Sequence, residues 1–170
     1  MMTTSSFLGI IWPMTYLHTL FICAFLLLGS TDATAQTDSP LPKWGSIGAD
    51  IVNVRTGPGT RYPVAWTFKQ RGHPIKVIAE FGMWFRIEDI EGEQGWIYRP
   101  FYSSRRTALV VGADNAPLYA DPKQTMLLAY LEPGVVVSLE ECKGASCEVR
   151  VAERKGWVNR GYLGMLSEQD

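Results

Sequence analysis

The sequence predicts an all-β protein made of two small tandem barrels, and three observations lead to this prediction. Similar blocks of sequence recur about 62 residues apart. Hydrophobic and polar residues alternate in short runs such as 73–80 and 85–88, which is the period of a strand with one buried face. Glycine-containing turn signals separate these runs, and no amphipathic helical pattern appears after residue 36. Short strands at this spacing are typical of small antiparallel barrels or sandwiches.

Comparison of the chain with itself defines two repeats. Gly72 and Gly134 lie 62 positions apart. The other matched pairs follow the same shift or one that is a residue smaller: Asn53 with Asn115, Trp66 with Leu128, Gly95-Trp96-Ile97 with Gly156-Trp157-Val158, and Phe101 with Tyr162. A common spacing over this length indicates an internal duplication. We therefore expect one domain at 47–103 and a second at 107–166.

The first 35 residues have the features of a secretory signal peptide. Residues 17–28 form an apolar run that only His18 and Thr19 interrupt, and Ala33-Thr34-Ala35 supplies the small residues that precede a cleavage site. We expect cleavage after Ala35, a flexible leader at 36–46, and a periplasmic or secreted protein. The alternative is an uncleaved N-terminal anchor, because the apolar stretch approaches the length of a membrane span.

The charge of the chain restricts the classes of partner. The whole sequence has 16 basic and 17 acidic residues, and signal removal takes away Asp32 alone, so the mature chain is balanced at 16 and 16. A balanced surface argues against nucleic acid and against a polybasic membrane contact. It is compatible with sugars, peptides or a protein partner. We expect a monomer that reaches a membrane only through a retained signal.

An ordered set of motifs runs through residues 53–102. Its members are Asn53-Val54-Arg55-Thr56-Gly57-Pro58, Tyr62-Pro63-Val64, Gly72, Trp84-Phe85-Arg86-Ile87 and Gly95-Trp96-Ile97. This set resembles the bacterial SH3-like domain family. The second repeat resembles the family more loosely, since Asn115-Ala116-Pro117-Leu118 stands in place of the N-V-R-x-G-P start, whereas Gly156-Trp157-Val158 is retained. The resemblance implies two tandem SH3-like barrels of five or six strands after the signal peptide, and a non-catalytic binding role, often at the bacterial cell wall.

Cys142 and Cys147 bracket a four-residue turn. In an exported protein this spacing predicts a disulfide across a β-hairpin. A redox-active pair and a metal site are the alternatives. The gap does not match C-x-x-C, and after signal removal only His73 and no third cysteine would remain to complete a zinc site. We expect no metal and no cofactor.

Catalytic constellations are missing from the sequence. His73 is expected to be a solvent-facing turn residue, since no nucleophile motif accompanies it. Four carboxylates gather near one turn: Glu88, Asp89, Glu91 and Glu93. We interpret them as a solvated loop, because a glycosidase needs two carboxylates that face each other across a cleft. The protein is therefore predicted not to be an enzyme, and a hydrolase is the disfavoured alternative.

Strand alternation divides the residues of the first repeat into two faces. Phe85, Ile87 and Ile97 should point into the barrel, with Phe85 and Ile87 matched to Val149 and Val151 of the second repeat. The outward residues are then Trp84, Arg86, Trp96 and Tyr98, and their matches are Glu148, Arg150, Trp157 and Asn159. Exposed rings of this number usually mark a contact surface. Because the second repeat lacks two of them, we expect the ligand surface on the first.

The candidate ligand-binding residues are Trp84, Arg86, Trp96 and Tyr98, with Tyr62 and Arg55 beside them. Trp and Tyr rings stack on sugars or grip peptides, and Arg86 is able to pair with a carboxylate. Two alternatives stay open. The Trp96 and Trp157 rings would be buried if they form architectural contacts, and Arg55 would instead bind turn carbonyls. Trp66 is expected in the core.

These observations predict an exported binding module. Its ligand would be a cell-wall (peptidoglycan) fragment or an extended peptide on the aromatic face of the first domain. The alternative is a structural or adaptor protein of the cell envelope, in which this surface docks another protein.

Overall fold

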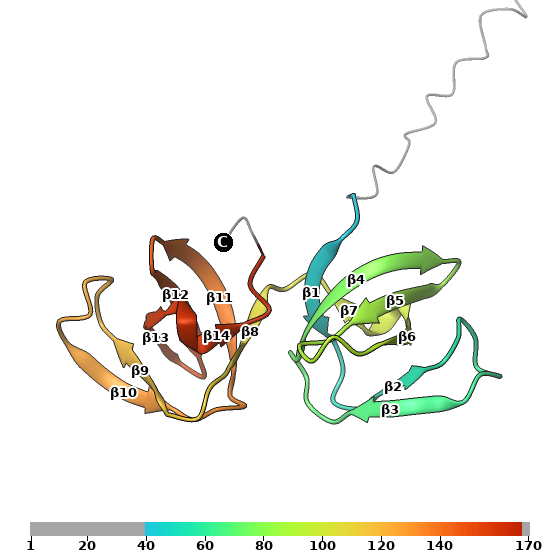
Figure 1. The fold of residues 1–170 in the computed structure, drawn as a ribbon, viewed down its shortest axis with the longest axis horizontal. Coiled ribbons are helices and arrows are strands. Elements are labelled where there is room, and N and C mark those ends of the chain that lie inside the picture. Colours follow the sequence, from blue (N-terminus) through green and yellow to red (C-terminus); the bar gives the residue numbers. More distant parts are fainter. Residues whose placement is uncertain (1–39, 168–170) are drawn as a thin grey trace, which may run out of the picture. The chain divides into compact units, whose positions relative to one another are not determined.

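A computed structural model describes residues 40–167, which lie in the compact unit Ser39–Asp170. These residues form strands and turns, with two 3-10 helices of three residues each (Figure 1). The expected signal peptide and residues 36–39 of the expected leader lie outside the described range. Between residues 40 and 167, no helix is long and apolar enough to cross a membrane.

Seven strands of the first repeat form one antiparallel sheet, called barrel 1 (Figure 1). They are β1 (Lys43–Ile47), β2 (Val52–Arg55), β3 (Val64–Phe68), β4 (Pro74–Phe81), β5 (Trp84–Glu88), β6 (Gln94–Tyr98) and β7 (Tyr102–Ser103). Hydrogen-bonded neighbours follow the order β3-β2-β6-β5-β4-β1-β7, and the helix η1 (Arg99–Phe101) joins β6 to β7. The count exceeds the expected five or six because the two-residue β7 and the leader strand β1 both join the sheet.

The second repeat forms a sheet of the same topology, called barrel 2. Its strands are β8 (Thr107–Val110), β9 (Ala116–Tyr119), β10 (Leu127–Leu131), β11 (Val136–Lys143), β12 (Ser146–Val151), β13 (Arg154–Asn159) and β14 (Leu163–Gly164). Their order is β10-β9-β13-β12-β11-β8-β14, and η2 (Arg160–Tyr162) joins β13 to β14. Each strand therefore has the same neighbours as its counterpart in barrel 1, so the all-β tandem architecture is confirmed.

Strand β1 corrects the predicted leader. The segment 36–46 was expected to be flexible, but Lys43 already pairs with Val77 of β4, and Ser46 pairs with Ser103 of β7. Ser46 is 1% exposed. A five-residue strand that begins just after two prolines shows no clear alternation, and it is stabilised by neighbours distant in sequence.

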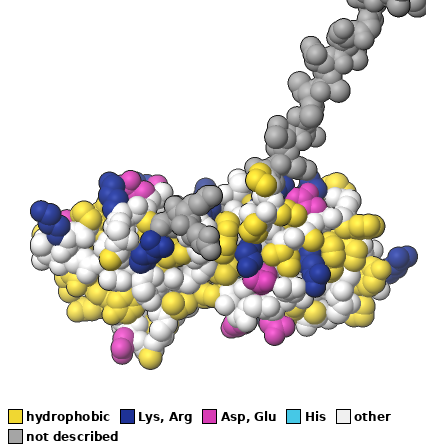
Figure 2. Space-filling model, turned by 45° about the horizontal axis from the view of Figure 1, so that its top comes forward, with side chains coloured by type: hydrophobic (Ala, Val, Ile, Leu, Met, Phe, Trp, Pro, Cys, Tyr) yellow, Lys and Arg dark blue, Asp and Glu magenta, His cyan; other side chains and the backbone are white. Residues whose placement is uncertain are grey.

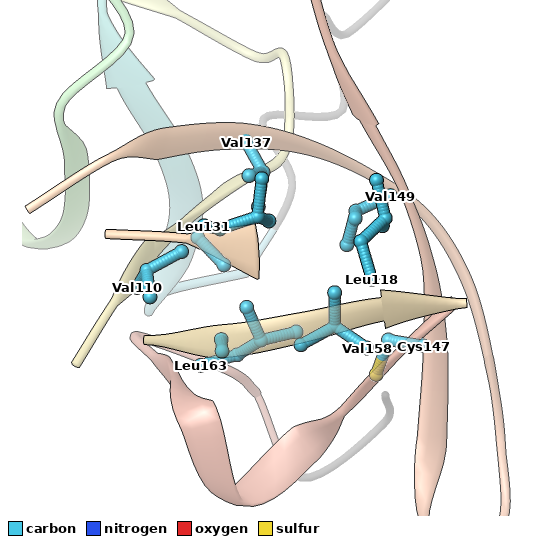
Figure 3. Packing of buried hydrophobic residues seen from close by; sticks show 10 residues of the cluster. Val110, Leu118, Leu131, Val137, Cys147, Val149, Val158 and Leu163 are labelled. Atoms are coloured by element: carbon cyan, nitrogen blue, oxygen red, sulfur yellow. The ribbon is translucent and has the colours of Figure 1, made fainter. Parts of the chain in front are cut away.

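Each barrel encloses its own hydrophobic core. The fully buried side chains of barrel 1 include Ile47, Val52, Val54, Ile75, Val77, Ile87 and Ile97. Those of barrel 2 include Val110, Leu118, Val137, Cys147, Val149 and Val158, which converge in Figure 3. The inward orientation of Phe85, Ile87 and Ile97 is confirmed. Trp66 packs at the margin of the first core and is half-buried.

The strand register corrects the matching of the two repeats in their central strands. Phe85 pairs with Ile97, and Cys147 pairs with Val158, so Phe85 corresponds to Cys147 and not to Val149. Ile87 likewise corresponds to Val149 and not to Val151, since each pairs with the glycine of its late Gly-Trp motif. The prediction was wrong by two residues because a shift of two leaves the alternation of a strand unchanged.

A second correction concerns the start of the repeats. A Cβ atom added to Gly95 would meet Val54, and one added to Gly156 would meet Leu118, so Val54 corresponds to Leu118. The neighbours follow: Asn53 corresponds to Pro117 rather than Asn115, Arg55 to Tyr119, and Trp66 to Ala129 rather than Leu128. The shift falls from 64 residues here to 61 at the late Gly-Trp motif, because three connecting turns are each one residue shorter in barrel 2.

Candidate ligand-binding face of barrel 1

Strand pairing places five of the six candidate residues on one face of barrel 1. Trp84 of β5 pairs with Tyr98 of β6. In the adjacent row, Trp96 of β6 pairs with Arg86 of β5 on one side and with Arg55 of β2 on the other. Arg86 and Tyr98 are exposed, whereas Trp84, Trp96 and Arg55 are half-buried. These five residues are called the outer face.

One end of the outer face carries a continuous line of rings. The Trp84 and Tyr98 centroids lie 5.6 Å apart, and Phe101 of η1 lies 6.0 Å beyond Tyr98 in an edge-to-face arrangement. Ring pairs at these separations attract each other beyond the burial of their area. Trp84, Tyr98 and Phe101 are called the aromatic row.

Two exposed residues of the β4–β5 hairpin lie next to this row and were missed by the sequence analysis. Phe81 pairs with Trp84 and is 64% exposed, and Met83 is 50% exposed. Figure 2 shows hydrophobic side chains, in yellow, reaching the molecular surface among charged groups. The signal in the sequence was Gly82 between two large apolar residues, because a hairpin turn exposes the residues that flank it.

An ionic cluster holds the segment under the aromatic row. Arg99 donates a hydrogen bond from Nη2 to Glu80 at 2.8 Å, and its guanidinium lies 4.6 Å from the Phe85 ring centroid. Lys43 Nζ binds the other carboxylate oxygen of Glu80 at 2.6 Å. Because the backbone N–H of Arg99 also donates to Met83 O, this cluster ties η1 to the β4–β5 turn.

Arg86 has no hydrogen bond or ion pair with any described residue. Its cross-strand neighbours are Ala79 and Trp96, neither of which is charged. The nearest acidic residue along β5 is Glu88, and its carboxylate already binds Lys76 and accepts from Gln94 Nε2 at 2.8 Å. The hydrogen bond from Lys76 holds the pKa of Glu88 below its usual value.

Tyr62 and Arg55 shape the loop between β2 and β3. Arg55 Nη1 donates to the carbonyl of Tyr62 at 2.8 Å, which is the alternative role foreseen for this residue. The Tyr62 ring packs against Gly57, and the Arg61 guanidinium lies 5.4 Å from its centroid. Both predicted residues thus have a structural role in the loop, and Arg55 connects this loop to the outer face.

The corresponding face of barrel 2 has different chemistry. Register places Ser146, Glu148 and Asn159 at the positions of Trp84, Arg86 and Tyr98, so Arg150 is not the match of Arg86. Ser146 is buried and accepts from Gln124 Nε2, Glu148 lies 3.6 Å from Lys155 Nζ, and Asn159 accepts from the N–H of Gly161. Each of these three residues therefore has a partner, and no counterpart of the Trp84–Tyr98 ring pair stands at these positions.

Trp157 was expected to face outward with Trp96, but it is only 7% exposed. Lys143 Nζ lies 5.4 Å from its ring centroid, at the position that corresponds to Phe81. Trp96 is half-buried instead. The register leaves Trp157 on the outward side of β13, opposite Glu148, but its ring is buried there, which is the alternative left open for this residue.

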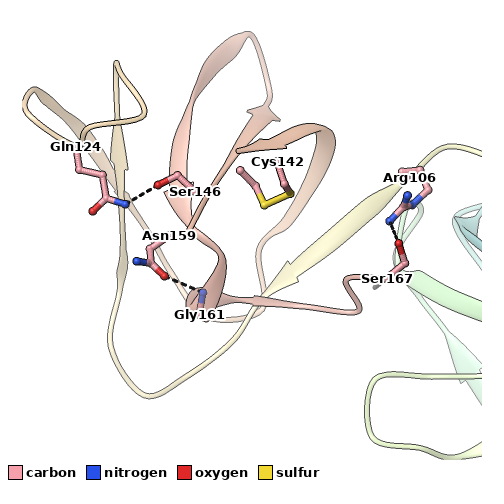
Figure 4. The surroundings of a disulfide bond; sticks show 8 residues. Arg106, Gln124, Cys142, Ser146, Asn159, Gly161 and Ser167 are labelled. Carbon is pink, nitrogen blue, oxygen red and sulfur yellow. Dashed lines mark hydrogen bonds between the residues drawn. A yellow bond between two sulfur atoms is a disulfide. The ribbon is translucent and has the colours of Figure 1, made fainter. Parts of the chain in front are cut away.

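Cys142 and Cys147 form the predicted disulfide, with a sulfur–sulfur distance of 2.00 Å (Figure 4). The two residues face each other across the β11–β12 hairpin. Cys147 is fully buried in the core of barrel 2, where it takes the place of Phe85. The disulfide thus stands where barrel 1 has Glu80 and Phe85.

Residues considered for catalysis lie in structural environments. The centroid of the His73 ring lies 4.7 Å from that of Phe68, and the His73 side chain is half-buried. The prediction of a solvent-facing His73 was therefore wrong. This burial lowers the pKa of His73, an effect that Asp89 and Glu91 partly oppose. Asp89 accepts hydrogen bonds from the N–H groups of Glu91 and Glu93 at 3.0 and 2.9 Å and organises their turn. Within residues 40–167, no three His, Cys, Asp or Glu side chains are grouped as a metal site requires.

A recess of about 460 Å³ lies elsewhere on barrel 1. It is lined by Ser46, Ile47, Gly48, Arg71, Gly72, Pro100, Tyr102, Ser103, Ser104 and Arg105. None of the predicted ligand residues lines it, and Arg71 is bound to Asp50 and to the Gly48 carbonyl. The outer face therefore remains the candidate site.

Comparison with solved structures finds similarity to two proteins of Trichomonas vaginalis. NlpC2 and NlpC1 are each 12% identical to this chain with a TM-score of 0.33. The matches cover 74% and 76% of this chain and 49% and 48% of theirs, so the chain spans about half the length of these structures. A search of curated proteins finds no match.

Comparison with protein families gives two matches in this chain. Residues 48–101 and 112–164 each match the family described as the bacterial SH3 domain. These ranges follow the two barrels and together make up more than half of the sequence. The chain therefore belongs to the bacterial SH3 domain family.

Proposed function

We propose that this protein is an exported, non-catalytic binding module that recognises peptidoglycan fragments through the outer face of barrel 1. The observation that carries the proposal is the aromatic row, which lies beside the exposed Phe81 and Met83. Aromatic faces stack on sugar rings and on extended peptides, and clustered exposed apolar side chains mark contact surfaces. Family membership supports a binding role.

Retention on purified peptidoglycan sacculi tests this function. The Trp84→Ala/Tyr98→Ala double variant should lose most of the retention, since it removes two of the three rings of the aromatic row. The matched control is Leu128→Ala/Tyr130→Ala, which removes two exposed apolar side chains from barrel 2. Circular dichroism should show that both variants are folded. Equal retention of the wild type and the barrel 1 variant would exclude the aromatic row as the binding site.

Export and the absence of catalysis are further parts of the proposal. Export rests on the signal-like residues 1–35, and the mature protein recovered from the producing cell should begin at Gln36. Intact mass of the secreted or periplasmic protein measures this directly. Incubation with sacculi should release no soluble fragments, because His73 and Asp89 are engaged in packing and turn contacts. Release that His73→Ala abolishes would reverse this part of the proposal.

A second candidate function is an adaptor that docks another envelope protein. Strand β10 of barrel 2 favours it, because Leu127, Leu128 and Tyr130 are 45%, 40% and 62% exposed, and Met126, just before the strand, is 58% exposed. Strand β10 also lies at one end of its sheet, where a partner is able to approach. Crosslinking in intact cells should then capture one reproducible protein, and Leu128→Ala/Tyr130→Ala should abolish that capture without changing retention on sacculi.

A further inference from the structure

We propose that Arg86 recognises a carboxylate of the bound cell-wall peptide, beside the rings that hold the rest of the fragment. This inference rests on the proposed function and specifies the ligand chemistry of the same face. Its starting point is the exposed Arg86 guanidinium, which has no partner among the described residues. A planar guanidinium with free donors is the side chain best suited to bind a carboxylate through two hydrogen bonds.

The neighbours of Arg86 leave its charge available for a ligand. On β4 it faces Ala79, whose methyl group neither pairs with it nor covers it, and on β6 it faces the Trp96 ring. Glu88, two residues along the same strand, is already engaged by Lys76 and Gln94. The carboxylate of Glu88 in the adjacent row is thus already paired, and the Arg86 guanidinium remains available to an incoming carboxylate.

In barrel 2, the residue at the position of Arg86 forms an ion pair within the barrel. Glu148 takes the place of Arg86, pairs with Trp157 in the register, and lies 3.6 Å from Lys155 Nζ. The neighbouring Glu141 is bound to Lys143 at 2.6 Å. The charge at this position is thus negative and paired in barrel 2, whereas it is positive and unpaired in barrel 1. At this position, an anionic ligand is complementary to barrel 1 and not to barrel 2.

The distance between the aromatic row and Arg86 predicts how far the carboxylate lies from the part of the ligand that contacts the rings. Trp84 lies two residues from Arg86 on the same face of β5, and Tyr98 lies two residues from Trp96 on β6. Side chains two residues apart along a strand are about 7 Å apart. A peptide or sugar stacked on Trp84 and Tyr98 therefore has its carboxylate within reach of Arg86 when the two groups are separated by about one residue.

Two probes and two variants test the inference. The probes are a soluble disaccharide-peptide fragment of peptidoglycan with free peptide carboxylates and the same fragment with those carboxylates converted to amides. The variants are Arg86→Gln and, as a control, Lys69→Gln, which removes one exposed positive charge from the β3–β4 turn of the same barrel. Affinities are measured by calorimetry on the mature full-length chain.

The wild type and Lys69→Gln should bind the free-carboxylate probe about tenfold more tightly than the amidated probe, as expected for one charge-assisted hydrogen-bonded pair. Arg86→Gln should bind both probes equally, at the affinity of the wild type for the amide. Discrimination that persists in Arg86→Gln, or equal binding of both probes by the wild type, would overturn the role of Arg86 while leaving the proposed function intact. If the wild type binds neither probe, this inference is overturned. Retention on sacculi then decides separately whether the proposed function also fails.

Discussion

Gly57 lies directly beneath the ring of Tyr62, and a Cβ atom added to Gly57 would come within 2.5 Å of a ring carbon. The N-V-R-x-G-P motif therefore contains a glycine for reasons of space, since the loop folds back on itself. Arg55 fastens the same loop by its hydrogen bond to the Tyr62 carbonyl. The motif thus builds the support on which one edge of the outer face rests.

Gly57→Ala should lower the free energy of unfolding by about 1–3 kcal/mol, because the ring must move to admit the methyl group. Gly59→Ala is the matched control, since its Cβ would stand 3.4 Å from the same ring in ordinary contact. Urea unfolding followed by tryptophan fluorescence measures both. Equal stability of the two variants would contradict the packing described for Tyr62.

Removal of the disulfide should destabilise barrel 2. The bond between Cys142 and Cys147 closes a short loop, for which chain entropy predicts a contribution of about 2 kcal/mol. Urea unfolding with and without a thiol reductant should show this loss in the wild type, with alkylation and mass spectrometry to confirm reduction. The Cys142→Ala/Cys147→Ala variant should not respond to reductant, and a response in that variant would assign the effect to another cause.

His73 should make stability depend on pH below neutrality. Desolvation by burial lowers its pKa in the folded state below the ordinary value of 6.5, so the unfolded chain binds the proton first. The free energy of unfolding should therefore fall as the pH drops through 6.5 and level off below the folded pKa. In His73→Gln, the midpoint of urea unfolding should change less with pH between 7.5 and 5.5 than in the wild type. This window lies above the pH range in which carboxylates titrate. An unchanged pH slope in His73→Gln would contradict the burial of this ring.

Asp89 should matter for stability and not for catalysis. It is 7% exposed and accepts from two backbone N–H groups, so Asp89→Ala leaves both donors without this acceptor. We expect a loss of about 2 kcal/mol in the free energy of unfolding. The exposed neighbour Glu93 provides the control, since Glu93→Ala keeps the turn bonds and should change stability by less than about 0.5 kcal/mol. Thermal and urea unfolding distinguish the two variants.

Much of the fold was predictable because it depends on local pattern. Alternation identified the buried positions Phe85, Ile87 and Ile97, and the Cys142–Cys147 spacing identified the disulfide. The rings of Trp84 and Tyr98 were placed on one face by the same alternation, and their pairing across β5 and β6 agrees with it. These features need only the two-residue period of a strand and a short turn.

The match between the repeats was not predictable in the same way. Alternation is unchanged by a shift of two residues, so sequence could not tell whether Arg86 corresponds to Glu148 or to Arg150. The length of the β5–β6 turn decides this, because the corresponding β12–β13 turn is one residue shorter. The approach of Lys143 of β11 to the Trp157 ring of β13 likewise depends on strands that meet only after folding.

Sequence by itself determined the tandem pair of small β-barrels, the inward orientation of Phe85, Ile87 and Ile97, and the Cys142–Cys147 pair, since these follow from an internal repeat, from strand alternation and from a short turn. Tertiary structure alone decided that Arg86 is left without a partner while Glu148 has one. An ion pair depends on which side chains the strand register brings within a few ångströms, and register is set by turns and by hydrogen bonds between distant segments.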